Sequence, residues 1–110
     1  MEIQELKDFS KRMHKKLESY YKFDDPRQLN LPITVKIMEE LGELCDDVLA
    51  HSGLQRKEKL ENKDMKNLQE EFADVILTTC NLAENMGVDI EEALKNKIKK
   101  IDNRFKEEWN

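Results

Sequence analysis

The sequence predicts an all-α protein, folded as a bundle of about four helices that assembles as an oligomer. Charged residues make up 39% of the 110 residues and apolar residues 38%, with only three glycines and two prolines. This composition, rich in Glu, Lys and Leu, favours helices over sheets. Apolar residues recur every three or four positions, which is the period of a helix with one buried face. At this length we expect residues 1–110 to form a single helical domain.

The first two helices are predicted over residues 2–21 and 32–51. Because proline disfavours helix in the residue before it, Pro26 predicts a break and a loop that continues to residue 31. Pro32 suits the first turn of the second helix. The predicted core positions of these helices are Ile3, Leu6, Phe9 or Ser10, Met13, Leu17 and Tyr20, then Ile33, Ile37, Leu41, Leu44 and Val48.

Two further helices are predicted over residues 64–86 and 89–107, after an exposed charged connector at 56–63. Asp64 and Asp89 suit N-cap positions, and Gly87 suits the end of the earlier helix. Residues 75–83 carry no charge, so that helix is apolar on more than one side. In so small a chain the second apolar side predicts contact with another subunit, and we expect at least a homodimer. The predicted core positions of the last helix are Ile90, Leu94, Ile98, Ile101 and Phe105.

Charge and cysteine content narrow the class of protein. The net charge of -5 argues against a general binder of nucleic acid polymers, which would usually be basic. Cys45 and Cys80 are isolated, and we expect both to be buried reduced thiols. The first residues do not resemble a signal peptide, and no stretch approaches the roughly 20 apolar residues of a membrane span. We therefore expect a cytoplasmic protein that does not associate with membranes.

Two near-identical acidic phrases mark the middle helices. They are Glu39-Glu40-Leu41-Gly42-Glu43-Leu44 and Glu70-Glu71-Phe72-Ala73-Asp74-Val75. In each phrase the second and third acids are three residues apart, which places both on one helix face at the edge of the apolar stripe. The pairs Glu40 with Glu43 and Glu71 with Asp74 therefore predict a site for a divalent cation. Ligation by carboxylates alone favours Mg²⁺ or Mn²⁺ over zinc.

A basic counterpart is predicted on the last helix, where Lys97, Lys100 and Arg104 share one shoulder of the apolar stripe. A basic shoulder beside a metal site suits a polyphosphate, because cations bind the oxygens that the metal does not reach. Both sets have a simpler interpretation as solvated helix faces. For the basic residues this simpler interpretation is the stronger one, since positive charge also suits a helix C-terminus.

These motifs resemble a known family. The two acidic phrases resemble the ExxE…ExxD signature of MazG-like nucleoside triphosphate pyrophosphohydrolases, and the segment 93–105 looks like the closing helix of that family. The resemblance implies a single-domain member with an all-α bundle that works as a dimer or tetramer. It implies Mg²⁺-dependent hydrolysis of a (deoxy)nucleoside triphosphate to the monophosphate and pyrophosphate, as house-cleaning of nucleotide pools.

Carried over by position, the resemblance gives each motif a role. Glu40, Glu43, Glu71 and Asp74 would ligate Mg²⁺ and form the catalytic centre, and Lys97, Lys100 and Arg104 would lie near the phosphates. Either Glu43 or Glu71 would accept the proton of the attacking water. The aromatic residues near the first loop, which are candidates for stacking on a base, are Phe9, Tyr20, Tyr21 and Phe23.

Other functions fit the same residues. The related all-α dUTPases and phosphoribosyl-ATP pyrophosphohydrolases resemble this family in their clustered acidic residues but differ in substrate. A non-enzymatic helical interaction or regulatory protein would use the apolar side of the third helix for assembly, and its acids would be mere surface. Convergence of the four acids in space separates the enzymes from the interaction protein.

Overall fold

The computed structural model describes residues 1–53 and 64–108, and these residues form helices without any strand. The helices are α1 (Ile3–Tyr21), the 3-10 helix η1 (Pro26–Leu29), α2 (Asn30–His51), α4 (Met65–Asn85) and α5 (Ile90–Phe105). The all-α prediction is confirmed, and each helix begins and ends within about two residues of its predicted bounds. The predicted connector at 56–63 lies outside the described residues.

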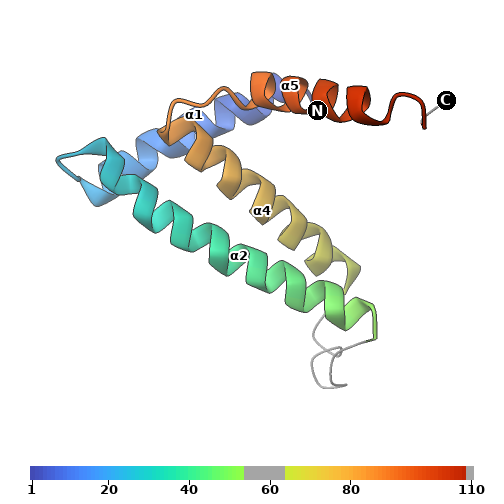
Figure 1. The fold of residues 1–110 in the computed structure, drawn as a ribbon. Helices are drawn as coiled ribbons and strands as arrows, with labels where there is room; N and C mark the ends of the chain where they lie inside the picture. The colour runs from blue at the N-terminus through green and yellow to red at the C-terminus, as the bar shows by residue number, and fades with distance from the viewer. Residues whose placement is uncertain (54–63, 109–110) are drawn as a thin grey trace.

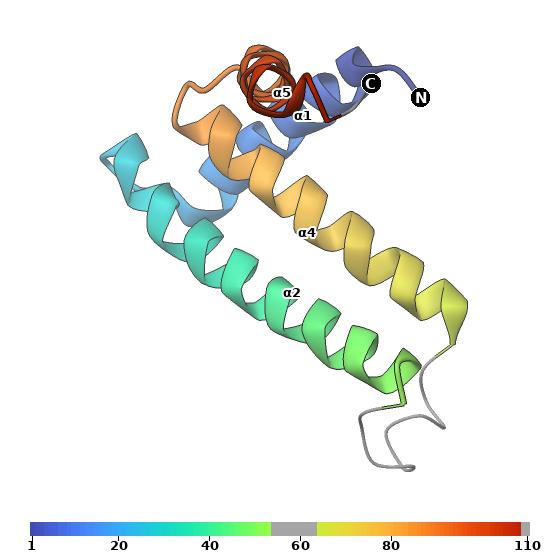
Figure 2. The same ribbon diagram turned by 45° about the vertical axis from the view of Figure 1, so that its right-hand side comes forward.

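The long helices α2 and α4 form an antiparallel hairpin, and this pair makes the most extensive packing contact of the fold. Helix α1 packs against α4, as Figure 1 shows. Helix α5 touches α4 only slightly and, in both Figure 1 and Figure 2, lies across the end of the hairpin beside α1. Ion pairs from Lys7 to Asp89 (3.7 Å) and Glu91 (3.5 Å) join α1 to the start of α5. The hairpin is therefore the frame on which any site must be built.

The ends of α4 and the start of α5 follow the predicted capping chemistry. The Asp64 carboxylate accepts a hydrogen bond from the Asn67 backbone N–H at 2.7 Å, and Asp89 accepts one from the Glu92 N–H at 3.2 Å. Gly87 has φ +71°, a left-handed conformation that favours glycine. Its N–H donates to the Glu84 carbonyl while the Val88 N–H donates to Ala83, the bond pattern that closes a helix C-terminus.

The predicted loop before α2 is wrong in part, because residues Pro26–Leu29 form the 3-10 helix η1 and α2 already begins at Asn30. Asp25 caps η1 in a reciprocal capping box with Gln28, and Pro26 supplies the fixed φ of a first turn. Leu29, assigned to the loop, is 2% exposed and belongs to the core. Pro26 does not end α1, since Lys22 closes that helix in the left-handed region at φ 53°.

The buried face of α2 differs from the predicted stripe. Its buried residues are Ile33, Glu40, Asp47 and Ala50. On a helical projection this face is rotated by roughly 80° from the predicted stripe, toward the acidic shoulder. The predicted core residues Leu41 and Val48 are instead 47% and 38% exposed. Glu40 and Asp47 thus lie within the packing face, Glu43 stays exposed, and an apolar edge of α2 is left uncovered in the single chain.

Three other expectations of burial are also wrong. Cys80 is buried as predicted, but Cys45 is exposed, because it lies on the side of α2 away from α4. Tyr20 is 78% exposed, and its neighbour Tyr21 is the residue of that turn that faces the other helices. Leu94 and Ile98 of α5 are exposed because α5 touches the hairpin so slightly. Among the described residues, no helix combines the length and apolarity needed to cross a membrane.

Candidate active site

The fold brings acids from both phrases together. One carboxylate oxygen from each of Glu40, Glu43 and Glu71 lies within 4.8 Å of the other two, although these residues are separated by up to 31 positions of sequence. The i, i+3 spacing in α2 directs Glu40 and Glu43 to one face. The antiparallel packing of α4 then presents Glu71 to both. Three of the four predicted acids therefore form one cluster.

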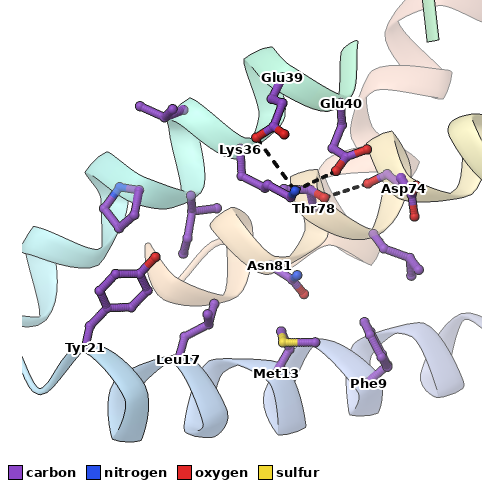
Figure 3. Close-up of a pocket in the computed structure, with 14 residues that line it drawn as sticks. Phe9, Met13, Leu17, Tyr21, Lys36, Glu39, Glu40, Asp74, Thr78 and Asn81 are labelled. Atoms are coloured by element: carbon purple, nitrogen blue, oxygen red, sulfur yellow. Dashed lines mark hydrogen bonds and ion pairs between the residues drawn. The ribbon is translucent and has the colours of Figure 1, made fainter. Parts of the chain in front are cut away.

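The fourth acid, Asp74, lies beside Glu40 but outside the tight group of three. Contact with Glu40 and proximity to Glu70 help to raise the pKa of Asp74, after burial, which is the largest cause; nearby Lys36 lowers it. Figure 3 shows Asp74 on α4 facing the same space as Glu40. The arrangement leaves Asp74 at the edge of the cluster, where a larger ligand than a bare ion would meet it.

The cluster is electrostatically strained. Burial raises the pKa of Glu71, and the carboxylates of Glu43, Asp74, Glu40 and Asp47 raise it further in that order. Like charges at close range favour the neutral form of Glu71. A divalent cation removes this repulsion, because it adds positive charge where the carboxylates meet.

Two carboxylate oxygens fit a metal in particular. Glu40 Oε2 and Glu71 Oε2 are buried, and neither has a hydrogen-bond partner among the described residues. A buried acceptor without a partner is costly, so such atoms are commonly partners of an ion or water. The donor set is all oxygen, which matches the preference of Mg²⁺ or Mn²⁺. These residues therefore fit the ion that the sequence predicts.

Sequence reasoning missed two residues beside the cluster. Lys36 Nζ lies 3.0 Å from Glu40 Oε1 and 3.7 Å from Glu39 Oε2 (Figure 3). Asp47 is fully buried, and its Oδ2 accepts a hydrogen bond from Asn67 Nδ2 at 2.9 Å. The signals were in the sequence: Lys36 precedes Glu40 by four positions, and Asp47 follows Glu43 by four.

A groove of about 730 Å³ opens beside the acids, between α1, α2 and α4. This volume is typical of a small-molecule site. In Figure 3, Phe9, Met13, Leu17 and Tyr21 point from α1 toward the two other helices and form an apolar wall. Glu40 and Asp74 line the same groove. One cavity thus joins an apolar wall to part of the acidic cluster.

Two of the four aromatic residues that are candidates for stacking on a base line the groove, and two do not. Phe9 and Tyr21 line the groove, whereas Tyr20 and Phe23 do not. Phe23 stacks on Tyr21, with ring centroids 5.3 Å apart, so it supports a groove residue from outside. On α4, Asn81 also lines the groove, and its buried Oδ1 has no hydrogen-bond partner in the described part of the chain. Sequence reasoning missed Asn81.

The basic shoulder of α5 is not brought to the acids in the single chain. Lys97, Lys100 and Arg104 are exposed. In the described ranges they make no ion pair or hydrogen bond with the cluster, and none of them lines the groove. The guanidinium of Arg104 lies over the ring of the neighbouring Phe105. Their role at the phosphates stays a prediction.

Comparisons with known proteins show which family the chain belongs to. The family model described as MazG nucleotide pyrophosphohydrolase domain matches residues 28–109. The chain is 33% identical over 79 residues to the uncharacterized protein YpjD of Bacillus subtilis (strain 168), a match that covers 72% of this chain and 69% of that protein.

The name of a second relative states an enzymatic activity. The chain is 42% identical over 50 residues to the nucleoside triphosphate pyrophosphohydrolase/pyrophosphatase MazG of Thermotoga maritima. That match covers 46% of this chain and 20% of the longer protein. No solved structure matches. Because the family model covers most of the chain, including both acidic phrases and α5, the chain belongs to the MazG nucleotide pyrophosphohydrolase family.

Proposed function

We propose that this protein is a Mg²⁺-dependent pyrophosphohydrolase that cleaves a (deoxy)nucleoside triphosphate to the monophosphate and pyrophosphate. The observation that carries the proposal is the convergence of Glu40, Glu43 and Glu71 beside a groove of nucleotide size, which Glu40 also lines. Membership of the MazG family supports the same class of reaction. A merely solvated acidic surface would not bury two carboxylate oxygens without partners.

The residues divide into a metal end and a base end. Glu40, Glu43, Glu71 and Asp74 would hold the metal, Mn²⁺ being an alternative to Mg²⁺. Bound Mg²⁺ supplies charge neutralisation for phosphate oxygens and acidifies water. Whichever of Glu43 and Glu71 is less engaged with the metal would accept the proton of the attacking water.

The apolar wall of α1 gives the groove its base end. Phe9 and Tyr21, at opposite ends of this wall, each offer a ring face for stacking on a nucleobase, and Asn81 offers an unpartnered side-chain carbonyl oxygen between them (Figure 3). Desolvating an amide without a partner costs about 1–3 kcal/mol. A ligand that donates to Asn81 Oδ1 recovers that cost, so the base end would select ligands with a donor at that point.

Assembly is part of the proposal. Helices α2 and α4 expose large apolar side chains that the fold of one chain leaves uncovered: Met38, Leu41, Phe72 and Ile76. Helix α5 has no buried residue at all within its described length. A homodimer or homotetramer would cover these surfaces, and a partner subunit would give the basic residues of α5 a second route to an active site.

The test is pyrophosphate release from a panel of canonical and damaged nucleoside triphosphates, with and without Mg²⁺. Metal-dependent release that is lost in Glu40→Gln, with the fold retained by circular dichroism, would support the proposal. If the wild type releases pyrophosphate only from a phosphoribosylated nucleotide, or only from dUTP, it is one of the related enzymes instead. No release from any nucleotide, with no effect of Mg²⁺ on thermal stability, would favour an interaction protein.

A further inference from the structure

The charge of the groove poses a problem for a polyphosphate. Its lining carries the carboxylates of Glu39, Glu40 and Asp74. Among the described residues that line it, Lys36 is the only one with a positive charge, and the basic residues of α5 are absent from its walls. A triphosphate that enters this groove therefore meets three acids and a single cation. Metal ions offset the acids, but a phosphate oxygen beyond their reach needs a protein donor.

The position of Lys36 suits such a donor. Its Nζ is 3.0 Å from Glu40 Oε1, so in the structure it occupies one oxygen of a carboxylate that belongs to the metal cluster. Its side chain is half exposed and so retains access to the groove and to solvent. A metal ion that engages Glu40 competes with the ammonium for the same carboxylate. The ammonium displaced in this way stays in the groove wall, one helical turn from Glu40, where a phosphate would lie.

We propose that Lys36 is a phosphate-binding residue whose ammonium exchanges the Glu40 carboxylate for an oxygen of the metal-bound triphosphate. This inference rests on the proposed function, since it assigns a role within the same site. The alternative is an ordinary i, i+4 ion pair on one helix, which supports the helix slightly and contributes nothing to binding.

The two roles predict opposite responses to Lys36→Gln. If the ammonium binds phosphate, the variant should bind triphosphate about tenfold or more weakly, the loss expected when one charge-assisted hydrogen bond is removed. The same variant should bind Mg²⁺ alone as tightly as the wild type or more tightly, because a competitor for Glu40 has been removed. Lys36→Arg keeps the charge and should recover most of the triphosphate affinity.

Calorimetric titration measures both responses on the intact chain. The probes are Mg²⁺ alone and, at saturating Mg²⁺, a nucleoside triphosphate with a non-cleavable α,β-methylene bridge. The matched control is Lys95→Gln, which removes an i, i+4 Lys–Glu pair with Glu91 (3.4 Å) on α5, away from the groove. This control should leave both affinities unchanged.

Each outcome decides the inference. Weaker analogue binding in Lys36→Gln alone, with Mg²⁺ binding unimpaired, supports it. Analogue affinity equal to that of the wild type overturns it, and so does a parallel loss of Mg²⁺ affinity, because Lys36 would then act only by positioning Glu40. Failure of the proposed function looks different: the wild type would bind the analogue but release no pyrophosphate from any triphosphate.

Discussion

Replacing Glu71 by glutamine should raise the stability of the metal-free protein and weaken its response to Mg²⁺. Glu71 is partly buried, its Oε2 has no partner in the described part of the chain, and Glu43 and Glu40 lie within 4.8 Å of it in the cluster. Each like-charge contact of this kind costs a few tenths of a kcal/mol. Four acids, Glu43, Asp74, Glu40 and Asp47, act on Glu71. Removing the Glu71 charge should therefore stabilise the metal-free fold by about 1 kcal/mol, or about 4 °C in Tm for a domain of this size.

Mg²⁺ should reverse the order of the melting temperatures of the wild type and Glu71→Gln. A ligand present at a hundred times its Kd stabilises the native state by about 2.7 kcal/mol, which is about 10 °C here. Glutamine offers a neutral oxygen in place of a carboxylate, so the variant should show less than half of that shift. The wild type thus melts below Glu71→Gln without metal and above it at saturating Mg²⁺.

Thermal melting followed by circular dichroism, in chelator and in increasing Mg²⁺, measures both effects. Glu70→Gln is the matched control, because it removes the same charge from the neighbouring exposed position. The control should change the metal-free Tm and the Mg²⁺ shift little. The reasoning is refuted if Glu71→Gln lowers the metal-free Tm and keeps the full Mg²⁺ shift, or if Glu70→Gln behaves in the same way.

Four further outcomes are expected. Without metal, the Tm of the wild type relative to Glu71→Gln should rise as pH falls through the raised pKa of Glu71 to its ordinary value of 4.5, because a raised acid pKa means that the folded state binds the proton more tightly; a difference that stays flat from neutral pH down to 4.5 would contradict this. Asn81→Leu should raise the free energy of unfolding by about 1 kcal/mol, since it removes a buried oxygen without a partner, while lowering kcat/KM. A lower Tm would contradict the claim that this oxygen destabilises the fold. Asn67→Leu should cost about 2 kcal/mol in urea unfolding, because the Asp47 carboxylate is buried and loses a donor at 2.9 Å; an unchanged midpoint would rule out that contribution. Light scattering at micromolar concentration should show at least a dimer for the wild type and a smaller species for Phe72→Glu, whose side chain is 49% exposed on α4; a monomeric wild type would disprove the assembly.

The helices were predictable because their signals are local. Apolar spacing, the N-caps Asp64 and Asp89 and the left-handed Gly87 act within one or two turns, so one sequence suffices to place them. The prediction lacks the helix η1 because Pro26 by itself indicates only a break in the preceding helix. The signal for η1 is the reciprocal capping box of Asp25 with Gln28. Rotation of a helix about its own axis is a tertiary property. The turn of α2 toward its acids could not be inferred from its own stripe.

That rotation also explains why the candidate site was predicted in part. Three of the four i, i+3 acids meet, because the same phrase occurs on both helices and antiparallel packing brings the two phrases together. Asp47 and Lys36 share the face of the cluster, yet counting charges ranks them with the surface residues. Only the packing shows that Asp47 is fully buried and that Lys36 lines the groove beside Glu40. An acidic pair on a helix thus predicts a site best when the whole face is considered, because the residues that tune a metal cluster occupy the adjacent turns.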